Sequence, residues 1–248
     1  MDPTPASKLE GPIAATESSA PFHGVGTQPI PGPGLPPLPL ASAGYVEEEY
    51  FVSGEHEGVP YRTSLLVRKP GDPAAFSGVV IFETLHAAGA VPMSAHHIAL
   101  VEQGHGYAMV ASQKAALDAH VKPSNPVRYA SLEISDLSPP DQGDEQQGPG
   151  DMAAHFRALD RMAPVSNAIM SLVGSLLKSN SPTGPFGGLE VKYLVMGGSS
   201  QTGGTTLRFI RDAHASARMP DGSAVFDGYF PALAGGAEPV GPRDVPVV

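Results

Sequence analysis

The chain has 248 residues, of which 41% are hydrophobic and 16% are charged, so it can bury the core of one large domain and is too apolar to be disordered throughout. Its formal net charge of -10, with no cluster of Lys and Arg, argues against nucleic acid or an anionic membrane as a partner. The lack of cysteine excludes disulfides, a thiolate nucleophile and cysteine-ligated metal sites.

Residues 1–43 are rich in Pro, Gly, Ala and Ser, and we predict that they form an extended arm that lies on the domain or is left mobile. The stretch PIPGPGLPPLPL shows the reason. Proline has no amide hydrogen, so such a stretch cannot sustain a helix or pair as a central strand. Residues 44–248 are expected to form the folded domain.

The first half of this domain has the pattern of a β-hairpin followed by a parallel sheet. Two β-rich runs, 45–54 and 60–70, flank the turn-like EHEGV and predict an antiparallel hairpin. GVVIFETL (78–85) is a continuous apolar run, typical of a strand that is buried on both faces of a parallel sheet. A helix over 94–103 and a strand over 107–112 are expected next.

The second half of the domain alternates helices with strands. Residues 113–150 are rich in Pro, Asp, Gly and Gln without a clear period, which predicts a long surface excursion. Two helical stretches, broken or kinked at Pro164, lead to the buried strand VKYLVMGG (191–198). A helix over about 202–218, a strand within AVFDGYF and the closing DVPVV follow. This alternation predicts an α/β fold with a mostly parallel sheet flanked by helices.

The segment VKYLVMGGSSQTGGTT carries the motif most closely related to chemistry. In the G-x-S-x-G motif a nucleophilic serine sits on a sharp strand-to-helix turn, and small residues stand two places before and after it. Gly198, Ser200 and Thr202 have this spacing, with Thr202 in place of the second glycine and Gly203 one position later. Ser200 is the predicted nucleophile, and the backbone N–H of Gln201 is the predicted first donor of an oxyanion hole.

Two other interpretations of this turn remain open. A serine before a helix is often only an N-cap, whose hydroxyl satisfies the amides of the first turn. The stretch from Gly198 to Thr205 is also one residue away from the phosphate-binding pattern G-x-x-x-x-G-K-[ST]. The residue that is missing is the lysine that reaches the phosphates, and the acidic chain has no obvious substitute nearby, which disfavours nucleotide binding.

Several segments, taken in order, resemble a bacterial family described as alpha/beta hydrolase domain proteins: GYVEEEYFVSG, PYRTSLLVRKP, SGVVIFETL, RYASLEI, GGSSQTG and VFDGYF. The resemblance covers about residues 44–248, and its most specific element is the Ser-Gln-[Ser/Thr] turn. It implies the α/β-hydrolase fold, Ser200 as the nucleophile and hydrolysis of carboxylic esters without a cofactor. Where the family commonly reads E-W-L-N after the early strand, this chain has E-T-L-H, a difference that bears on substrate specificity.

The loop after the early strand supplies the second oxyanion donor in this fold, and the backbone N–H of Leu85 or His86 is the candidate. The His86 side chain is also an alternative catalytic base, although it lies on the wrong loop for the chain order Ser, acid, His. The neighbouring residues His96 and His97 face two directions and form a poor metal site. No metal or cofactor is expected.

The sequence after Ser200 lacks an evident base and acid. A serine hydroxyl needs a base, the base needs an orienting acid, and in this fold both follow the nucleophile. His214 is the only histidine after Ser200 and is predicted to lie on the helix that follows the turn, pointing away from it. We therefore expect the acid and the histidine beyond Val248 or on another chain, with the domain truncated at its C-terminal end.

The sequence thus predicts a serine esterase that acts on a small-molecule ester. The alternative is a non-catalytic module of the same fold that binds a small molecule or a partner. No stretch approaches the roughly 20 apolar residues of a membrane span, and the first residues lack the pattern of a secretion signal. A soluble protein is expected, its compartment left open, with a second chain or a C-terminal segment as a partner that completes the domain.

Overall fold

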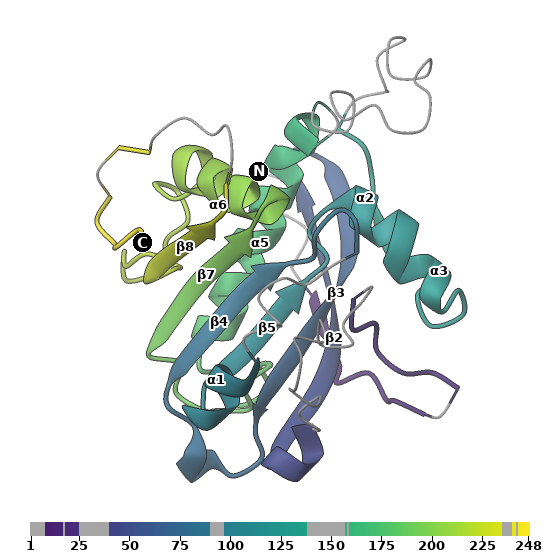
Figure 1. The fold of residues 1–248 in the computed structure, drawn as a ribbon. Helices are drawn as coiled ribbons and strands as arrows, with labels where there is room; N and C mark the ends of the chain where they lie inside the picture. The colour runs from purple at the N-terminus through teal and green to yellow at the C-terminus, as the bar shows by residue number, and fades with distance from the viewer. Residues whose placement is uncertain are drawn as a thin grey trace.

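The computed structural model describes residues 8–16, 18–24, 40–89, 97–137, 157, 159–234, 240–241 and 243–248. These residues contain one eight-stranded sheet, with the order β1-β2-β3-β5-β4-β7-β8 and β6 paired to β3 (Figure 1). The strands are β1 (Lys8–Glu10), β2 (Tyr45–His56), β3 (Val59–Pro70), β4 (Val79–Thr84), β5 (Gly106–Val110), β6 (Glu133–Ile134), β7 (Tyr193–Ser199) and β8 (Gly228–Ala232). The helices are α1 (His97–Glu102), α2 (Lys114–Ala116), α3 (Lys122–Ser124), α5 (Ala163–Lys178) and α6 (Gln201–Asp212).

The sheet has an antiparallel part and a parallel part. The predicted hairpin is confirmed: β2 and β3 pair over their whole length, and Glu57 and Gly58, both with positive φ, form the turn between them. Strands β5, β4, β7 and β8 are parallel, as the alternation of strands and helices predicted. The carboxyl ends of these four strands therefore meet at one edge of the sheet, where open α/β sheets bind ligands.

The core lies between the sheet and helices α5 and α6, which contact each other. Helix α5 buries Val165, Ile169 and Val173, whose spacing of four residues forms one apolar face. The helix passes so close to the segment before β8 that a Cβ added at Gly174 would lie 2.5 Å from the Val225 side chain. A glycine at this point thus lets α5 pack tightly beneath the parallel strands.

The start of α5 agrees with the predicted break at Pro164. A helical turn ends at Arg161, Met162 forms a turn, and α5 then begins with Pro164 in its first turn. Proline is tolerated there because the first amides of a helix have no intrahelical partner. Residues 151–156, where the preceding helix was predicted to begin, lie outside the described residues.

The predicted surface excursion over 113–150 is wrong for its first part. Residues 114–124 form a continuous helical run, in which α2 and α3 are joined by a π-helical turn, and this run buries Leu117 and Val121 completely. Ile134 in β6 is buried as well. Leu117 and Val121 are four residues apart, but two large apolar residues in so short a run give only a weak periodic signal, and their burial depends on distant parts of the chain. Residues 138–150 lie outside the described part.

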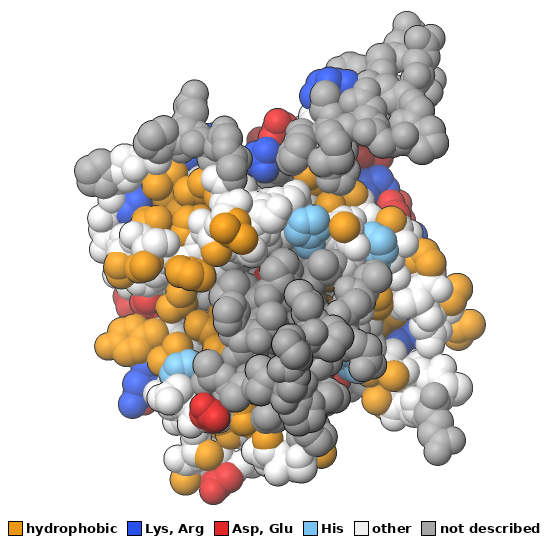
Figure 2. Space-filling model, in the orientation of Figure 1, with side chains coloured by type: hydrophobic (Ala, Val, Ile, Leu, Met, Phe, Trp, Pro, Cys, Tyr) orange, Lys and Arg blue, Asp and Glu red, His pale blue; other side chains and the backbone are white. Residues whose placement is uncertain are grey.

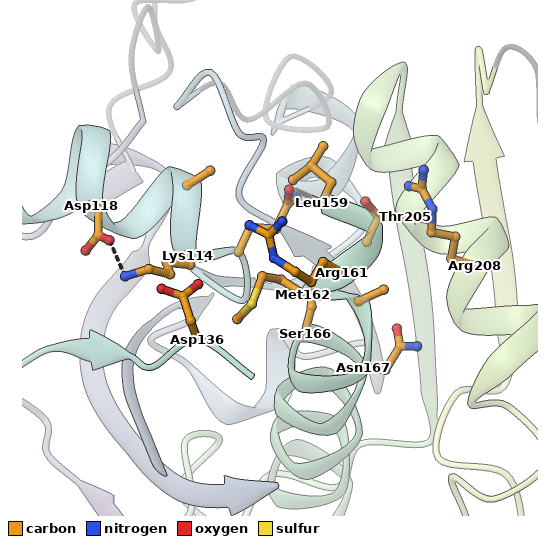
Figure 3. A pocket seen from close by; sticks show the side chains of 13 residues that line it. Lys114, Asp118, Asp136, Leu159, Arg161, Met162, Ser166, Asn167, Thr205 and Arg208 are labelled. Atoms are coloured by element: carbon orange, nitrogen blue, oxygen red, sulfur yellow. Dashed lines mark hydrogen bonds and ion pairs between the residues drawn. The ribbon is translucent and has the colours of Figure 1, made fainter. Parts of the chain in front are cut away.

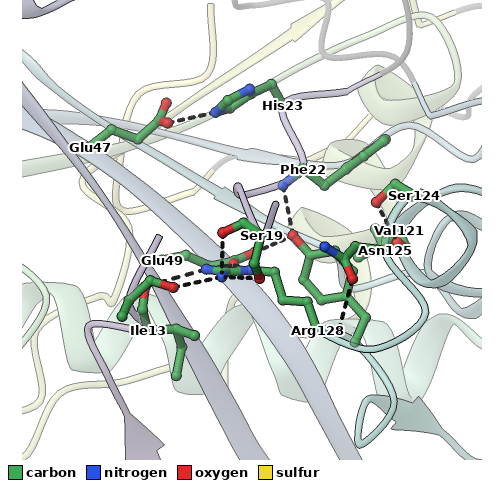
Figure 4. Close-up of polar contacts among 12 residues, drawn as sticks. Ile13, Ser19, Phe22, His23, Glu47, Glu49, Val121, Ser124, Asn125 and Arg128 are labelled. Carbon is green, nitrogen blue, oxygen red and sulfur yellow. Dashed lines mark hydrogen bonds and ion pairs between the residues drawn. The ribbon is translucent and has the colours of Figure 1, made fainter. Parts of the chain in front are cut away.

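The described part of the N-terminal arm lies along the domain, where a buried ion pair holds it (Figure 4). Strand β1 pairs with the edge of β2. The Arg128 guanidinium contacts Glu49 at 2.7 Å, both side chains being at most 2% exposed, and donates to the backbone oxygens of Ile13, Ala14 and Ser19. Tyr129 Oη donates to the same carboxylate at 3.0 Å. Residues far apart in the sequence thus fix the arm by buried, charge-assisted hydrogen bonds.

At the opposite edge of the sheet, the last described residues run beside β8. Val247 forms a parallel bridge with Tyr229, and Asp244 contacts His214 and Arg218 beyond the end of α6. Figure 2 shows hydrophobic side chains gathered on the side where Figure 1 places β8 and the C-terminal residues. Within the described residues, no helix has the length and apolar character needed to cross a membrane.

Candidate active site

Ser200 forms the sharp turn that joins β7 to α6. Its backbone has φ 56° and ψ -119°, a conformation that residues with a side chain rarely adopt and that costs on the order of 1–3 kcal/mol. The side chain is exposed and makes no capping hydrogen bond to the helix, so the interpretation of Ser200 as an ordinary N-cap is wrong. Among the described residues, none forms a hydrogen bond with its hydroxyl. The strained turn thus presents an unpaired hydroxyl at the carboxyl edge of the parallel strands.

Close backbone contacts on both sides of Ser200 explain the residues of the motif. A Cβ added at Gly198 would lie 2.4 Å from the Thr202 carbonyl oxygen, and one added at Gly203 would lie 2.4 Å from the Ala232 carbonyl oxygen at the end of β8. Thr202 is accommodated because its buried hydroxyl accepts from the Ser199 amide and donates to the Ser199 carbonyl, both at 2.9 Å. The second position that requires glycine is therefore 203 in this chain.

The amide of Gln201 meets the requirement for the first oxyanion donor. Gln201 is the first residue of α6, so its N–H has no partner within the helix and lies at the positive end of the helix dipole. The Leu85 amide, by contrast, donates to the Val110 carbonyl at 2.8 Å as part of the sheet. Leu85 is therefore a poor oxyanion donor, and of the two candidates the structure favours His86, the first residue beyond this sheet hydrogen bond.

Two carboxamides, Gln113 buried and Gln201 half-buried, connect the loop after β4 with the Ser200 turn. Gln201 Nε2 donates to Gln113 Oε1 at 2.9 Å, and Gln201 Oε1 accepts from the Ala87 amide at 3.2 Å. Gln113 Nε2 in turn donates to the Leu85 carbonyl at 3.1 Å. The side chain that follows Ser200 therefore bonds directly to the loop that carries His86.

The described histidines do not supply a base for Ser200. His86 Nδ1 accepts from the Ala88 amide at 3.0 Å, which places the proton of the neutral ring on Nε2 and leaves that nitrogen unable to accept one. His214 does not lie on the helix as predicted, because α6 ends at Asp212 and His214 belongs to the turn that follows. Its two ring nitrogens contact the Tyr229 hydroxyl and Asp244 at the far end of α6 from Ser200. His96 and the side chain of His97 lie outside the described residues.

A cavity of about 310 Å³ lies beside the turn, between the run that begins with α2, the start of α5 and helix α6 (Figure 3). Gln113 and Thr205 form part of its wall and both bond to the Gln201 side chain, so the cavity adjoins the residue after Ser200. Its lining combines apolar side chains with charged groups of both signs: Lys114, Arg161, Arg208, Asp118 and Asp136. Asn167, 8% exposed as a whole residue, also lines the cavity, and its carboxamide forms no hydrogen bond with any described residue.

The sequence interpretation missed Gln113 and Asn167. Gln113 lies in the stretch predicted as a surface excursion, and Asn167 lies within a predicted helix, where a single amide has no distinctive pattern. The only available signal was that Gln113 follows a short buried strand, at the edge where the other strands end. Among the described residues, no group of three or more His, Asp and Glu side chains could hold a metal ion.

The model of a family described as alpha/beta hydrolase domain matches residues 9–246. No curated protein matches the chain. The family match begins inside the predicted arm, which agrees with the packing of β1 on the domain.

Several solved structures are similar to the chain. A structure of esterase Est22 has 15% identity and a TM-score of 0.45, and the match covers 80% of this chain and 47% of the Est22 chain. A bacterial heroin esterase has 12% identity and a TM-score of 0.38, and the match covers 75% of this chain and 43% of that protein. A glucuronoyl esterase from Caldicellulosiruptor kristjansonii has 11% identity and a TM-score of 0.38, and the match covers 75% of this chain and 43% of that protein. The chain thus spans less than half the length of each of these proteins.

Proposed function

Because the chain belongs to the alpha/beta hydrolase domain family, we propose that it is a serine hydrolase that cleaves carboxylic esters through an acyl intermediate on Ser200. The observation that carries this proposal is the Ser200 turn, with its strained backbone, its exposed hydroxyl and the absence of a capping hydrogen bond. Strain of this kind persists only where the surrounding structure enforces it, and it is concentrated at functional sites.

In the proposed reaction, Ser200 Oγ attacks the ester carbonyl carbon and transfers its proton to a base. The tetrahedral oxyanion accepts hydrogen bonds from the backbone amides of Gln201 and His86. When it collapses, the bond to the alcohol breaks, and the alcohol leaves with the proton from the base. Water then attacks the acyl-serine in the same way and releases the carboxylic acid, so that the hydroxyl of Ser200 is restored.

The base and its orienting acid are proposed to be groups other than His86 and His214. Two observations support this. Within the described residues no histidine bonds to Ser200, and both His86 and His214 have partners that make them unsuitable. The chain order Ser, acid, His of this fold also places both groups after the nucleophile.

The cavity beside Gln201 is proposed to hold one part of the ester. Its apolar wall suits an aliphatic or aromatic group, and the Asn167 carboxamide, which bonds to no described residue, can donate to an oxygen on that group or accept from a hydroxyl. The family's E-W-L-N is E-T-L-H here, so Thr84 and His86 differ from the pattern at the same edge of the sheet. The identity of the acyl and alcohol groups is left to a substrate panel.

The proposal is tested with the full natural protein and a panel of nitrophenyl esters of increasing acyl length. Ser200→Ala should lower kcat by on the order of 10⁶, because the nucleophile itself is lost. Ser216→Ala removes a hydroxyl that bonds only to the Ala213 carbonyl beyond α6 and should leave the rate unchanged. Hydrolysis by Ser200→Ala at the wild-type rate, or no hydrolysis by the wild type, would contradict the proposal and favour a non-catalytic module.

A further inference from the structure

We propose that the carboxamides of Gln113 and Gln201 form a clamp that positions the two oxyanion-binding amides relative to each other. This inference rests on the proposed function and assigns a role to side chains that contact no reacting atom. The clamp is defined as these two side chains with their partners in the loop after β4. Its members come from the ends of three adjacent strands, β4, β5 and β7, which the sheet brings to one edge.

The Gln201 side chain connects the nucleophile turn to Gln113, which follows β5, and to Ala87 in the loop after β4. Its Nε2 donates to Gln113 Oε1 at 2.9 Å and to Thr205 Oγ1 at 3.1 Å. Its Oε1 accepts from the Ala87 amide at 3.2 Å and lies 3.4 Å from Gln113 Nε2. The backbone amide of Gln201 is the first proposed oxyanion donor, so its side chain anchors that donor to the loop that carries the second.

The Gln113 side chain fixes the direction of the second donor. Its Nε2 donates to the Leu85 carbonyl at 3.1 Å. That carbonyl and the N–H of His86 belong to one peptide unit, which is planar and trans, so the two groups point in opposite directions. Holding the Leu85 oxygen toward Gln113 therefore turns the His86 N–H away from it. The Ala87 bond to Gln201 fixes the next peptide unit, so the backbone is held on both sides of His86.

The backbone partners also define which atom of each carboxamide is oxygen and which is nitrogen. A carbonyl can only accept, so Gln113 must present Nε2 to Leu85, and an amide can only donate, so Gln201 must present Oε1 to Ala87. The remaining atoms, Gln113 Oε1 and Gln201 Nε2, then match each other. Glutamate at position 113 would lack the donor, and a hydrocarbon side chain would lack both bonds. The pattern thus requires an amide at position 113.

Burial makes the clamp rigid. Gln113 is 4% exposed and Ala87 is 6% exposed, while Gln201 is half-buried, so water has only limited access to the bonds between them. The Leu85 amide is also held by Val110 in β5. Preorganised donors lower the barrier because they need no rearrangement when the oxyanion forms. A loose loop would therefore weaken binding of the transition state more than binding of the substrate.

The test compares Gln113→Met, Gln201→Met and the double variant in the full natural protein. Loss of a whole oxyanion donor costs about 10² to 10³ in kcat, so a misplaced donor should cost about 10 to 100-fold, with KM changed by less than about threefold. Because the two side chains act as one unit, the double variant should lose little more than the worse single variant. Tyr229→Phe, which removes a buried hydrogen bond to His214, is the control and should keep wild-type kcat.

Gln113→Glu keeps the shape of the side chain and guards against variants that fail to fold. Its carboxylate cannot donate to the Leu85 carbonyl, whereas its protonated form can, so its kcat relative to the wild type should rise as the pH falls. Single variants that keep kcat within about twofold, losses that multiply in the double variant, or a relative kcat of Gln113→Glu that does not change with pH would overturn the clamp. Failure of the proposed function is distinct, since the wild type would then show no Ser200-dependent hydrolysis.

Discussion

Two polar clusters lie on this sheet, and they differ in what they leave unsatisfied. Around Arg128 and Glu49, a buried ion pair and several hydrogen bonds occupy both charged groups and fix the N-terminal arm. At the Ser200 turn, hydrogen bonds and close contacts hold every neighbour in place, while the exposed hydroxyl has no partner among the described residues. The first arrangement stabilises a fold, whereas the second positions a reactive group.

The largest effect on stability is expected at the Arg128 cluster. Arg128→Met leaves Glu49 buried without its cation, and breaking a buried pair in this way costs about 3–5 kcal/mol. Burial already raises the pKa of Glu49, and the Arg128 guanidinium opposes that rise, so the variant should favour the protonated acid. Urea unfolding measures the change, and ester hydrolysis below the unfolding transition should be preserved.

Arg211→Met is the matched control for this prediction. Arg211 pairs with its neighbour Asp212 at 2.6 Å, and its side chain is half exposed, so the loss should be below about 1 kcal/mol. Equal destabilisation by the two variants would mean that the buried pair of Arg128 and Glu49 stabilises the fold no more than an exposed ion pair does.

A smaller and opposite pair of effects is expected at two adjacent glycines of α6. Gly203→Ala places a methyl group 2.4 Å from the Ala232 carbonyl oxygen and should destabilise the protein by about 1–3 kcal/mol, since α6 must move away from β8. Gly204→Ala meets nothing closer than the Arg208 guanidinium at 3.8 Å and should stabilise the helix by up to about 1 kcal/mol. Thermal unfolding of both variants measures the difference. If both substitutions changed the stability in the same direction, the contact between Gly203 and the Ala232 carbonyl would not be as tight as the structure shows.

The smallest effect is expected at Asp244, which contacts His214 and Arg218. Hydrogen bonds from Arg218 and His214 hold the pKa of this carboxyl well below its usual range. Its contribution is therefore complete above its unfolded pKa of about 4 and is lost as the pH falls through the lower folded value. The melting temperature of the wild type should exceed that of Asp244→Asn by a few degrees at most above about pH 5, and by less in acid. A difference that does not change with pH would contradict this assignment.

Local signals in the sequence were sufficient for much of the fold and for the nucleophile turn. The run 78–85 has the continuous apolar character of a strand buried on both faces, and Pro164 marks the start of α5 because a proline fits only the first turn of a helix. Small residues around Ser200 reflect a steric rule that acts within a few residues. Each of these features depends on the nearest neighbours in the chain.

Features that depend on distant contacts could not be predicted. The helical run over 114–124 is stabilised by packing of Leu117 and Val121 in the core. Gln113 and Gln201 are 88 residues apart, and Arg128 contacts Ser19 across 109 residues. Even the choice of His86 over Leu85 as an oxyanion donor required the register of β4 and β5, which places the Leu85 amide against Val110.

The hydroxyl of Ser200 is proposed to act as a nucleophile, and covalent labelling tests this role. The full natural protein is treated with a fluorophosphonate, digested, and analysed by mass spectrometry to locate the phosphonyl group. We expect one adduct, on the oxygen of Ser200, which is absent from Ser200→Ala and unchanged in Ser216→Ala. An unlabelled wild type, or an adduct that persists in Ser200→Ala, would contradict it.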